Sequence, residues 1–248
     1  MATKSRIEWT EETWNPVIGC SKISGGCKFC YAEVMANRLR AMGVADYADG
    51  FAVRLLPDRI DQPRLRRQPT VYFVNSMSDL FHELVPDGYI DRVFTTIRET
   101  PQHVYQILTK RADRLPVYFA NRPVPENAWI GVSVENRVHG VPRIAQLQQV
   151  AAATRFLSVE PLLEDIGAIN LQGIHWVIVG GESGHGARPM RAEWVDNVQR
   201  RCVEANVSFF FKQWGAWGAD GIHRSKKANG RQFAGRTWDE MPQAAHSA

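Results

Sequence analysis

Six short segments of the chain are apolar almost throughout, and each turns polar at its C-terminal end. Each has a core of β-branched or aromatic residues, which is typical of a strand covered on both faces in a parallel sheet. The polar positions that end them should then lie together at one edge of that sheet. The six segments are 70–76, 103–110, 128–136, 154–162, 175–183 and 208–215.

The stretches between these segments predict helices. Residues 86–100 and 192–206 carry apolar residues at helical spacing, and in the second these include Val195 and Cys202. A further helix is expected over 31–42. The pattern is a βα repeat of about seven units with no long linker or low-complexity segment.

We therefore predict one α/β domain over residues 1–248, built as a complete or partial (βα) barrel of the TIM type. A flat, doubly wound sheet is the alternative, and the hydrophobic pattern separates the two poorly.

The composition is that of an ordinary soluble protein, with 44% hydrophobic and 23% charged residues. No apolar run is long enough to cross a bilayer, and the residues after Met1 do not form a signal peptide. We expect a cytoplasmic monomer without a membrane partner. The net charge of +4 permits a nucleic-acid partner but does not require one.

Three of the four cysteines, Cys20, Cys27 and Cys30, lie close together in the chain. In the cytosol, such spacing favours metal ligands over disulfide partners. Structural zinc takes four ligands, and a distant Cys202 or His82 could supply the fourth. A [4Fe–4S] cluster held by only three thiolates would leave one iron open for a ligand. Both alternatives stay open on spacing alone.

The loop over 19–31 resembles the cluster loop of radical S-adenosylmethionine (SAM) enzymes, whose usual pattern is Cys-x3-Cys-x-aromatic-Cys. Its second half, "CKFC", matches that pattern. The first spacing is longer, with six residues between Cys20 and Cys27. Gly25 and Gly26 could let the longer loop close around a cluster.

The wider sequence is similar to a family of phage and bacterial proteins of unassigned function. The segments that carry this similarity include "FVNSMSDLFHE", "WIGVSVEN", "VIVGGESG" and "FFFKQWG", and it runs from about residue 14 to residue 242. That family is similar, more distantly, to spore photoproduct lyase, a radical SAM enzyme that reverses a thymine dimer in DNA.

The resemblance implies a barrel of the radical SAM kind that holds a [4Fe–4S] cluster and cleaves SAM to a 5′-deoxyadenosyl radical. It implies an electron donor such as flavodoxin or ferredoxin, and damaged DNA as substrate with the target base flipped out. The reaction would be lesion repair of the lyase type or removal of an alkyl adduct. The alternatives are radical SAM modification of RNA, a peptide or a small molecule, and a zinc-stabilised nucleic-acid-binding protein without catalysis.

Strand-end position and the resemblance together nominate SAM contacts. We expect Ser76, Ser78 and Asp79, at and just after the end of 70–76, to bind the amino group of SAM. We expect Lys110 to bind the SAM carboxylate, and Glu135 with Asn136 to bind the ribose. The glycine-rich stretch 180–184 could bind adenine or be an ordinary turn. A structural ion pair is the alternative for Glu135 and Glu160. The full set is Ser76, Ser78, Asp79, Lys110, Ser133, Glu135, Asn136, Glu160, Gly181 and Glu182.

A basic segment over 222–236 follows two tryptophans and suits a phosphate backbone with an unstacked base. A solvated charge run is the alternative. Cys202 could donate a hydrogen atom to a product radical, or be an inert thiol of the core. The predicted nucleic-acid contacts are Lys212, Trp214, Trp217, Arg224, Lys226, Lys227 and Arg231.

Overall fold

One sheet runs through the computed structural model. The structure describes residues 3–5 and 7–242, so the outermost ends of the domain predicted over 1–248 lie outside the described residues. The strand order is β1-β2-β5-β6-β7-β8-β9-β10. The β1 strand is antiparallel to β2, and every later neighbouring pair is parallel. A separate hairpin pairs β3 with β4. The strands are β1 Thr3–Lys4, β2 Glu12–Trp14, β3 Val17–Ile18, β4 Arg54–Leu55, β5 Val71–Val74, β6 Val104–Thr109, β7 Ala128–Ser133, β8 Thr154–Val159, β9 Trp176–Gly180 and β10 Ser208–Gln213.

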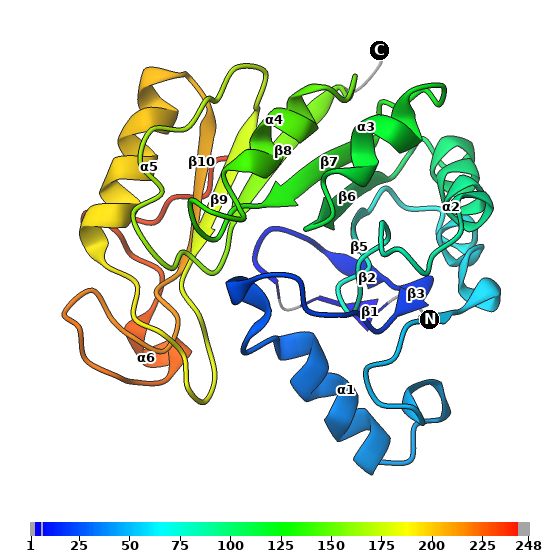
Figure 1. Ribbon diagram of the computed structural model, residues 1–248, viewed down its shortest axis with the longest axis horizontal. Coiled ribbons are helices and arrows are strands. Elements are labelled where there is room, and N and C mark those ends of the chain that lie inside the picture. The colour runs from blue at the N-terminus through cyan, green and yellow to red at the C-terminus, as the bar shows by residue number, and fades with distance from the viewer. Residues whose placement is uncertain (1–2, 6, 243–248) are drawn as a thin grey trace.

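The strand order decides between the two predicted layouts. A doubly wound sheet reverses its order at a switch point. Here the parallel strands follow chain order without reversal, with β1 and β10 at the two edges, so the crossovers all advance in one direction. Figure 1 shows the sheet curving, with α2, α3, α4 and α5 along its outer side. The fold is a partial (βα) barrel, as predicted, and the flat alternative is wrong.

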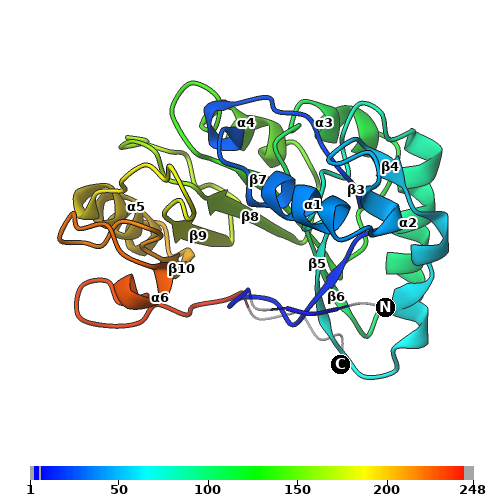
Figure 2. The ribbon, with the colours of Figure 1, turned by 90° about the horizontal axis from the view of Figure 1, so that it is seen from below.

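The helices α1 to α5 match the predicted positions, α6 was not predicted, and one expected helix is missing. They are α1 Tyr31–Ala41, α2 Asp87–Glu99, α3 Arg114–Phe119, α4 Pro142–Gln148, α5 Ala192–Glu204 and α6 Lys226–Asn229. Figures 1 and 2 place α1 and α6 on the open side of the curved sheet, away from the outer helices.

The missing helix was expected in the connection between β8 and β9, where the structure has none. Gly167 and Gly173 take φ angles of 68° and 64° in this connection. These left-handed conformations interrupt a helix, and glycine adopts them without steric cost. Among the helices of the described residues, none combines the length and the apolar composition that a membrane crossing requires.

Alternate residues of each strand face opposite sides of the sheet. The outer positions pack beneath the helices in the main core. The inner positions near the strand amino ends form an aromatic layer inside the curve, made of Trp9, Phe73, Trp129, Phe156, Trp176, Ile178 and Phe210.

Trp9 belongs to this aromatic layer although it precedes the first parallel strand. Its ring packs edge-on against Phe73 at 4.8 Å between centroids, and its carbonyl accepts a 3.1 Å hydrogen bond from Gln106 Nε2. Both contacts fasten the N-terminal segment to the inner face. The aromatic layer therefore fills the interior below the carboxyl ends of the strands, where the inner positions turn polar.

Gly131 supplies the space that the Phe156 ring occupies within this layer. A Cβ atom at Gly131 would lie 2.4 Å from the ring. We expect Gly131→Ala to lower the free energy of unfolding by about 1–3 kcal/mol, because a packed interior does not absorb an added methyl group. Urea unfolding followed by tryptophan fluorescence measures the change.

Gly88 in α2 provides the matched control, because nothing lies within 4 Å of a Cβ atom built there. Gly88→Ala should leave stability unchanged or raise it slightly, since alanine favours the helix. Equal stability of Gly131→Ala and the wild type would contradict the packing described for the aromatic layer.

Candidate functional site

A cavity of about 490 Å³ lies where the parallel strands end, within the size range of small-molecule sites. All three clustered cysteines line it. So do Lys212, Lys226 and eight of the ten predicted SAM contacts, which are Ser76, Ser78, Asp79, Lys110, Ser133, Glu160, Gly181 and Glu182. The expectation that polar strand ends converge is met for these residues.

The cysteine loop is held by backbone hydrogen bonds. The N–H of Cys20 donates to the Phe51 carbonyl at 3.0 Å, and a 3-10 turn over Gly25–Cys27 brings Cys27 round beside Ser24. Cys30 is the residue before α1, so the start of that helix fixes the backbone at the third cysteine.

The three thiols fit a [4Fe–4S] cluster in their chemistry. Each is partly exposed and free of a disulfide, and all three open on one cavity. In the part of the chain that the structure describes, no three His, Cys, Asp or Glu side chains are gathered closely enough to ligate a single ion. A four-iron cluster takes each thiolate on a different iron and does not need such a group.

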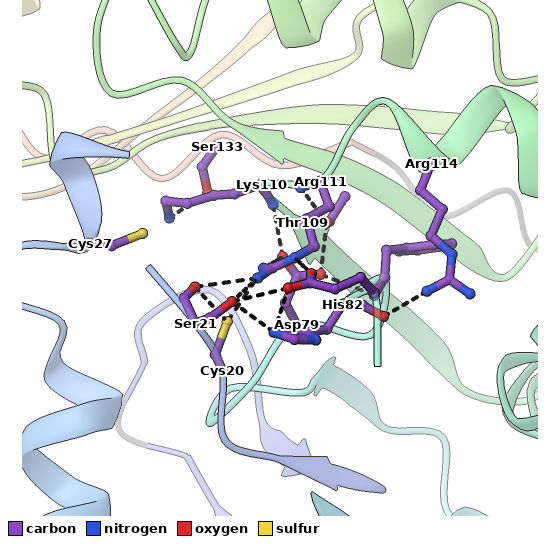
Figure 3. A network of polar contacts seen from close by, with 12 residues as sticks. Cys20, Ser21, Cys27, Asp79, His82, Thr109, Lys110, Arg111, Arg114 and Ser133 are labelled. Atoms are coloured by element: carbon purple, nitrogen blue, oxygen red, sulfur yellow. Dashed lines mark hydrogen bonds and ion pairs between the residues drawn. The ribbon is translucent and has the colours of Figure 1, made fainter. Parts of the chain in front are cut away.

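Arg111 joins the cysteine loop to the sheet, as Figure 3 shows. The guanidinium lies 3.4 Å from Cys20 Sγ and 3.2 Å from Asp79 Oδ2, and it donates to Ser21 Oγ at 2.8 Å. A further hydrogen bond reaches Glu83 at 2.8 Å. The Arg111 and Asp79 side chains are each 8% exposed, so this is a buried ion pair.

The surroundings of the thiols shift their pKa values in opposite directions. Burial, aided by the Asp79 charge, raises the pKa of Cys20 to about 11 although Arg111 opposes this. Burial also opposes ionisation of Cys27, but a backbone hydrogen bond at Ile23 and the Lys110 charge outweigh it and hold the pKa of that thiol below its ordinary value. Cys27 is therefore the more readily ionised of the two.

Asp79 lines the cavity, but its carboxylate is already occupied. Its oxygens accept hydrogen bonds from the Phe81 and Lys110 N–H groups, each at 3.0 Å, and from Thr109 Oγ1 at 2.7 Å, besides the Arg111 contact. This carboxylate organises the ends of β5 and β6. It leaves little capacity for the ligand amino group that we expected it to bind.

The other residues predicted near the amino-acid part of SAM make fewer hydrogen bonds within the protein than Asp79 does. Lys110 Nζ donates to Ser133 Oγ at 3.1 Å and so connects the ends of β6 and β7. Ser76 Oγ donates to Asn15 Oδ1 at 3.2 Å, and Ser78 Oγ donates to the Val17 carbonyl at 2.7 Å. Lys110 is the cation of this group that faces the cavity.

Two predicted ribose contacts do not line the cavity. Glu135 is fully buried and pairs with Arg143 at 2.6 Å, which is the structural alternative that the sequence left open. Asn136 Oδ1 accepts from the N–H groups of His139 and Gly140 and closes a turn. Both residues follow the end of β7, where strand alternation no longer fixes the side-chain direction.

Arg188 is a site residue that the sequence reasoning missed. Its guanidinium donates to both oxygens of Glu182, at 2.9 and 2.6 Å, and to the Gly25 carbonyl at 3.0 Å. It also lies 5.5 Å from the Phe29 ring centroid. Arg188 therefore clamps the glycine-rich loop to the cysteine loop, and the Glu182 carboxylate is engaged in that clamp.

The predicted nucleic-acid contacts differ in their exposure. Lys212 and Lys226 line the cavity, and Lys227 is exposed on α6. Trp214 is 3% exposed within the core, so its ring is not available to stack on a base, and that prediction is wrong. Trp217 is half-buried, and its indole N–H donates to the Ala187 carbonyl at 2.7 Å.

The basic segment is largely neutralised by acids outside its own sequence window. Arg224 pairs with Asp220 at 2.6 Å, Lys226 pairs with Glu8 at 3.4 Å, and Arg231 pairs with Asp239. The charge run of 222–236 is therefore weaker at the surface than the sequence indicates.

Cys202 lies in the core between α5 and the sheet and does not line the cavity. Burial raises the pKa of its thiol to about 12. Its position outside the cavity does not favour the role as a hydrogen donor, which stays a prediction.

These features define a partial (βα) barrel with a cysteine loop facing a cavity at the carboxyl ends of its strands. The chain matches the family described as protein of unknown function DUF5131 over residues 4–242, and it belongs to that family. No curated protein matches it by sequence.

Solved structures of spore photoproduct lyase are distantly similar to this chain. The enzyme complexed with dinucleoside spore photoproduct has a TM-score of 0.45 and 13% identity, covering 81% of this chain and 63% of that chain. A variant with bound AdoMet and the same dinucleoside has a TM-score of 0.44 and 13% identity over the same shares. Another variant matches 92% of this chain and 72% of that chain at 14% identity and a TM-score of 0.44. The chain thus spans less than two thirds of the first two structures.

The Asp79–Arg111 pair gives a stability prediction. We expect Asp79→Ala to lower the free energy of unfolding by about 3–5 kcal/mol, because it removes the buried carboxylate partner of the guanidinium and leaves it the largely exposed Glu83. Glu193→Gln is the control, since Glu193 forms a largely exposed pair with Arg191 and should change stability by less than about 1 kcal/mol. Thermal and urea unfolding measure both, and similar effects for the two variants would contradict the role given to Asp79.

His82 gives a prediction for the dependence of stability on pH. Its Nδ1 accepts from the Leu84 N–H, so Nε2 carries the proton and donates to Ser21 Oγ at 2.9 Å. Burial and the nearby Arg111 charge hold the pKa of His82 below its ordinary value. In the unfolded chain His82 therefore takes up a proton at about pH 6.5, whereas in the folded protein it does not.

Stability should consequently be retained above about pH 6.5 and fall as the pH decreases below it, by up to about 1.4 kcal/mol per pH unit for this one group. His82→Gln should reduce that slope by about one proton. The pKa values of His103 and His175 are also lowered, mainly by burial, so part of the slope should persist. Urea unfolding across this pH range tests the prediction, and an unchanged slope in His82→Gln would refute it.

Proposed function

We propose that this protein is a radical SAM enzyme that holds a [4Fe–4S] cluster on Cys20, Cys27 and Cys30 and acts on a nucleobase in DNA. The observation that carries the proposal is the placement of three thiols from one short loop on a single cavity at the strand carboxyl ends. The resemblance of that loop to the radical SAM pattern supports it. Repair of a damaged base is the reaction that this chemistry suits best.

When bound, the cluster would supply an electron to the sulfonium of SAM and so produce a carbon radical that removes hydrogen from the substrate. The chain supplies the binding and the shielding. Lys110 is suited to pair with the SAM carboxylate, and Ser133 fixes its Nζ at 3.1 Å. Phe29 lines the cavity and lies beside the Arg188 guanidinium.

The proposed substrate side of the cavity has an apolar floor. Trp9 and Phe73 close the cavity toward the barrel interior, and Leu108 adds an apolar wall. A base flipped out of a strand could enter this space, and damage lowers the cost of flipping because it weakens stacking and pairing. Lys226 and Lys227 on α6 are suited to the phosphates that flank such a base.

The proposal predicts the outcome of removing one thiol. Cys27→Ala should lose most of the iron and acid-labile sulfide of the anaerobically purified protein and should abolish SAM cleavage under dithionite, because two thiolates do not hold the cluster. Metal and sulfide analysis, a visible spectrum and assay of 5′-deoxyadenosine are the measurements.

Cys202→Ala is the matched control, since Cys202 lies in the core away from the cavity. It should keep its iron and its SAM cleavage. A colourless wild-type protein with one zinc per chain, or a Cys27→Ala variant that still cleaves SAM, would refute the proposal.

A further inference from the structure

We infer that Glu160, Lys212, Gln213 and Trp9 form the subsite that recognises the substrate base. They belong to the ends of β8 and β10 and to the N-terminal segment, whereas Cys20 and Arg111 meet at the ends of β5 and β6. The inference rests on the proposed function in taking a base as the substrate.

Glu160 and Lys212 form an ion pair within the cavity wall. Lys212 Nζ lies 3.1 and 3.2 Å from the two Glu160 oxygens, and the side chains are 15% and 16% exposed. Gly180 lies between them on β9, and a Cβ atom there would be 2.5 Å from Glu160 Oε1. The Glu160 side chain thus lies over Gly180 and reaches Lys212, so that a hydrogen-bond acceptor and a donor stand side by side.

Two residues that line the same cavity each carry a polar atom without a protein partner. Trp9 Nε1 and Gln213 Oε1 are buried and make no hydrogen bond within the described residues. Trp9 is 3% exposed and Gln213 is 6% exposed, and both line the cavity. An unpaired buried donor and acceptor are costly in free energy, and a ligand that hydrogen-bonds to them would remove that cost.

A nucleobase has the chemistry that this wall would recognise. Its edge carries a hydrogen-bond acceptor beside a donor, which Lys212 and Glu160 complement, and its faces are flat and apolar. The floor beneath the pair is the Trp9 ring, whose centroid lies 5.9 Å from Lys212 Nζ. The paired charges cancel, which suits a neutral base better than an anion.

A purely structural ion pair would not require this arrangement. Desolvation offsets most of the attraction in a buried pair, so such a pair adds little to stability. Here the pair borders a cavity and is flanked by unsatisfied polar atoms, which is the pattern of a binding site.

Binding of thymidylyl-thymidine to the anaerobically purified full chain tests the inference, by calorimetry without reductant or SAM. The dinucleotide should bind the wild type, and Lys212→Met and Glu160→Gln should each weaken binding about tenfold or more. Arg137→Met is the matched control, because Arg137 pairs with Asp165 outside the cavity, and it should bind as the wild type does.

The exchanged pair Glu160→Lys with Lys212→Glu separates recognition from stability. It keeps an ion pair but reverses the donor and the acceptor, so it should fold and still bind weakly. Wild-type affinity in the exchanged pair or in Lys212→Met, no binding of thymidylyl-thymidine by the wild type, or equal binding of the corresponding abasic dinucleotide would each overturn the inference.

The outcomes are distinguishable from failure of the proposed function. Iron content and dinucleotide binding are measured separately on the wild type, and the calorimetry uses neither reductant nor SAM. A wild type that lacks iron but binds the dinucleotide through Lys212 would overturn the radical SAM proposal and support the subsite.

Discussion

The buried ion pair between Asp79 and Arg111 is the interaction on which the site depends. Asp79 fixes the backbone after β5 and β6 through hydrogen bonds to both segments, and Arg111 extends from that point to Cys20 and Ser21. A loop rich in glycine has high conformational entropy and does not hold three thiols in place by itself. The pair supplies that constraint from the rigid end of the sheet, and the Arg188 clamp supplies a second one at Gly25.

The interior of the curved sheet has an aromatic half near the amino ends of the strands and a polar half near their carboxyl ends. Alternation directs one set of side chains inward along the whole length of each strand, so the same geometry builds both the floor and the site. Near the amino ends this set is aromatic and packs without space for a side chain at Gly131. Near the carboxyl ends it becomes Ser133, Ser158, Glu160 and Lys212, which leave the cavity open.

Much of the fold could be predicted from the sequence because strand burial and helix amphipathicity are local patterns. All six predicted strand segments contain strands, and the polar ends of most of them converge. The choice between a barrel and a flat sheet could not be made locally, since it depends on which strands pair. The helix expected between β8 and β9 failed because two residues in left-handed conformations outweigh a repeat pattern.

Where the surroundings of a site residue differ from the expectation, the deciding contact lies outside the local sequence pattern. Glu135 and Asn136 lie beyond the last residue of β7, where side-chain direction is set by Arg143 and by a turn, and neither is visible from alternation. The charge of 222–236 was overestimated because Glu8, Asp220 and Asp239, which pair with it, lie outside that window. Trp9 gave no signal at all, because it reaches the cavity from outside the βα repeat.

Of the three lysines that line the cavity, Lys110 and Lys212 differ in a way that suits each to a ligand of different charge. Lys212 is paired with Glu160, so its surroundings are neutral and favour an uncharged ligand that offers both an acceptor and a donor. Lys110 has a hydroxyl, Ser133 Oγ, as its side-chain partner and forms no salt bridge within 4.0 Å in the described residues. A cation facing a cavity without a carboxylate partner retains its attraction for an anion, and the low dielectric of a buried site strengthens it. The carboxylate of SAM meets that requirement and a neutral base does not, so in the proposed reaction this distribution of charge favours the cofactor beside Lys110 and the substrate beside Lys212.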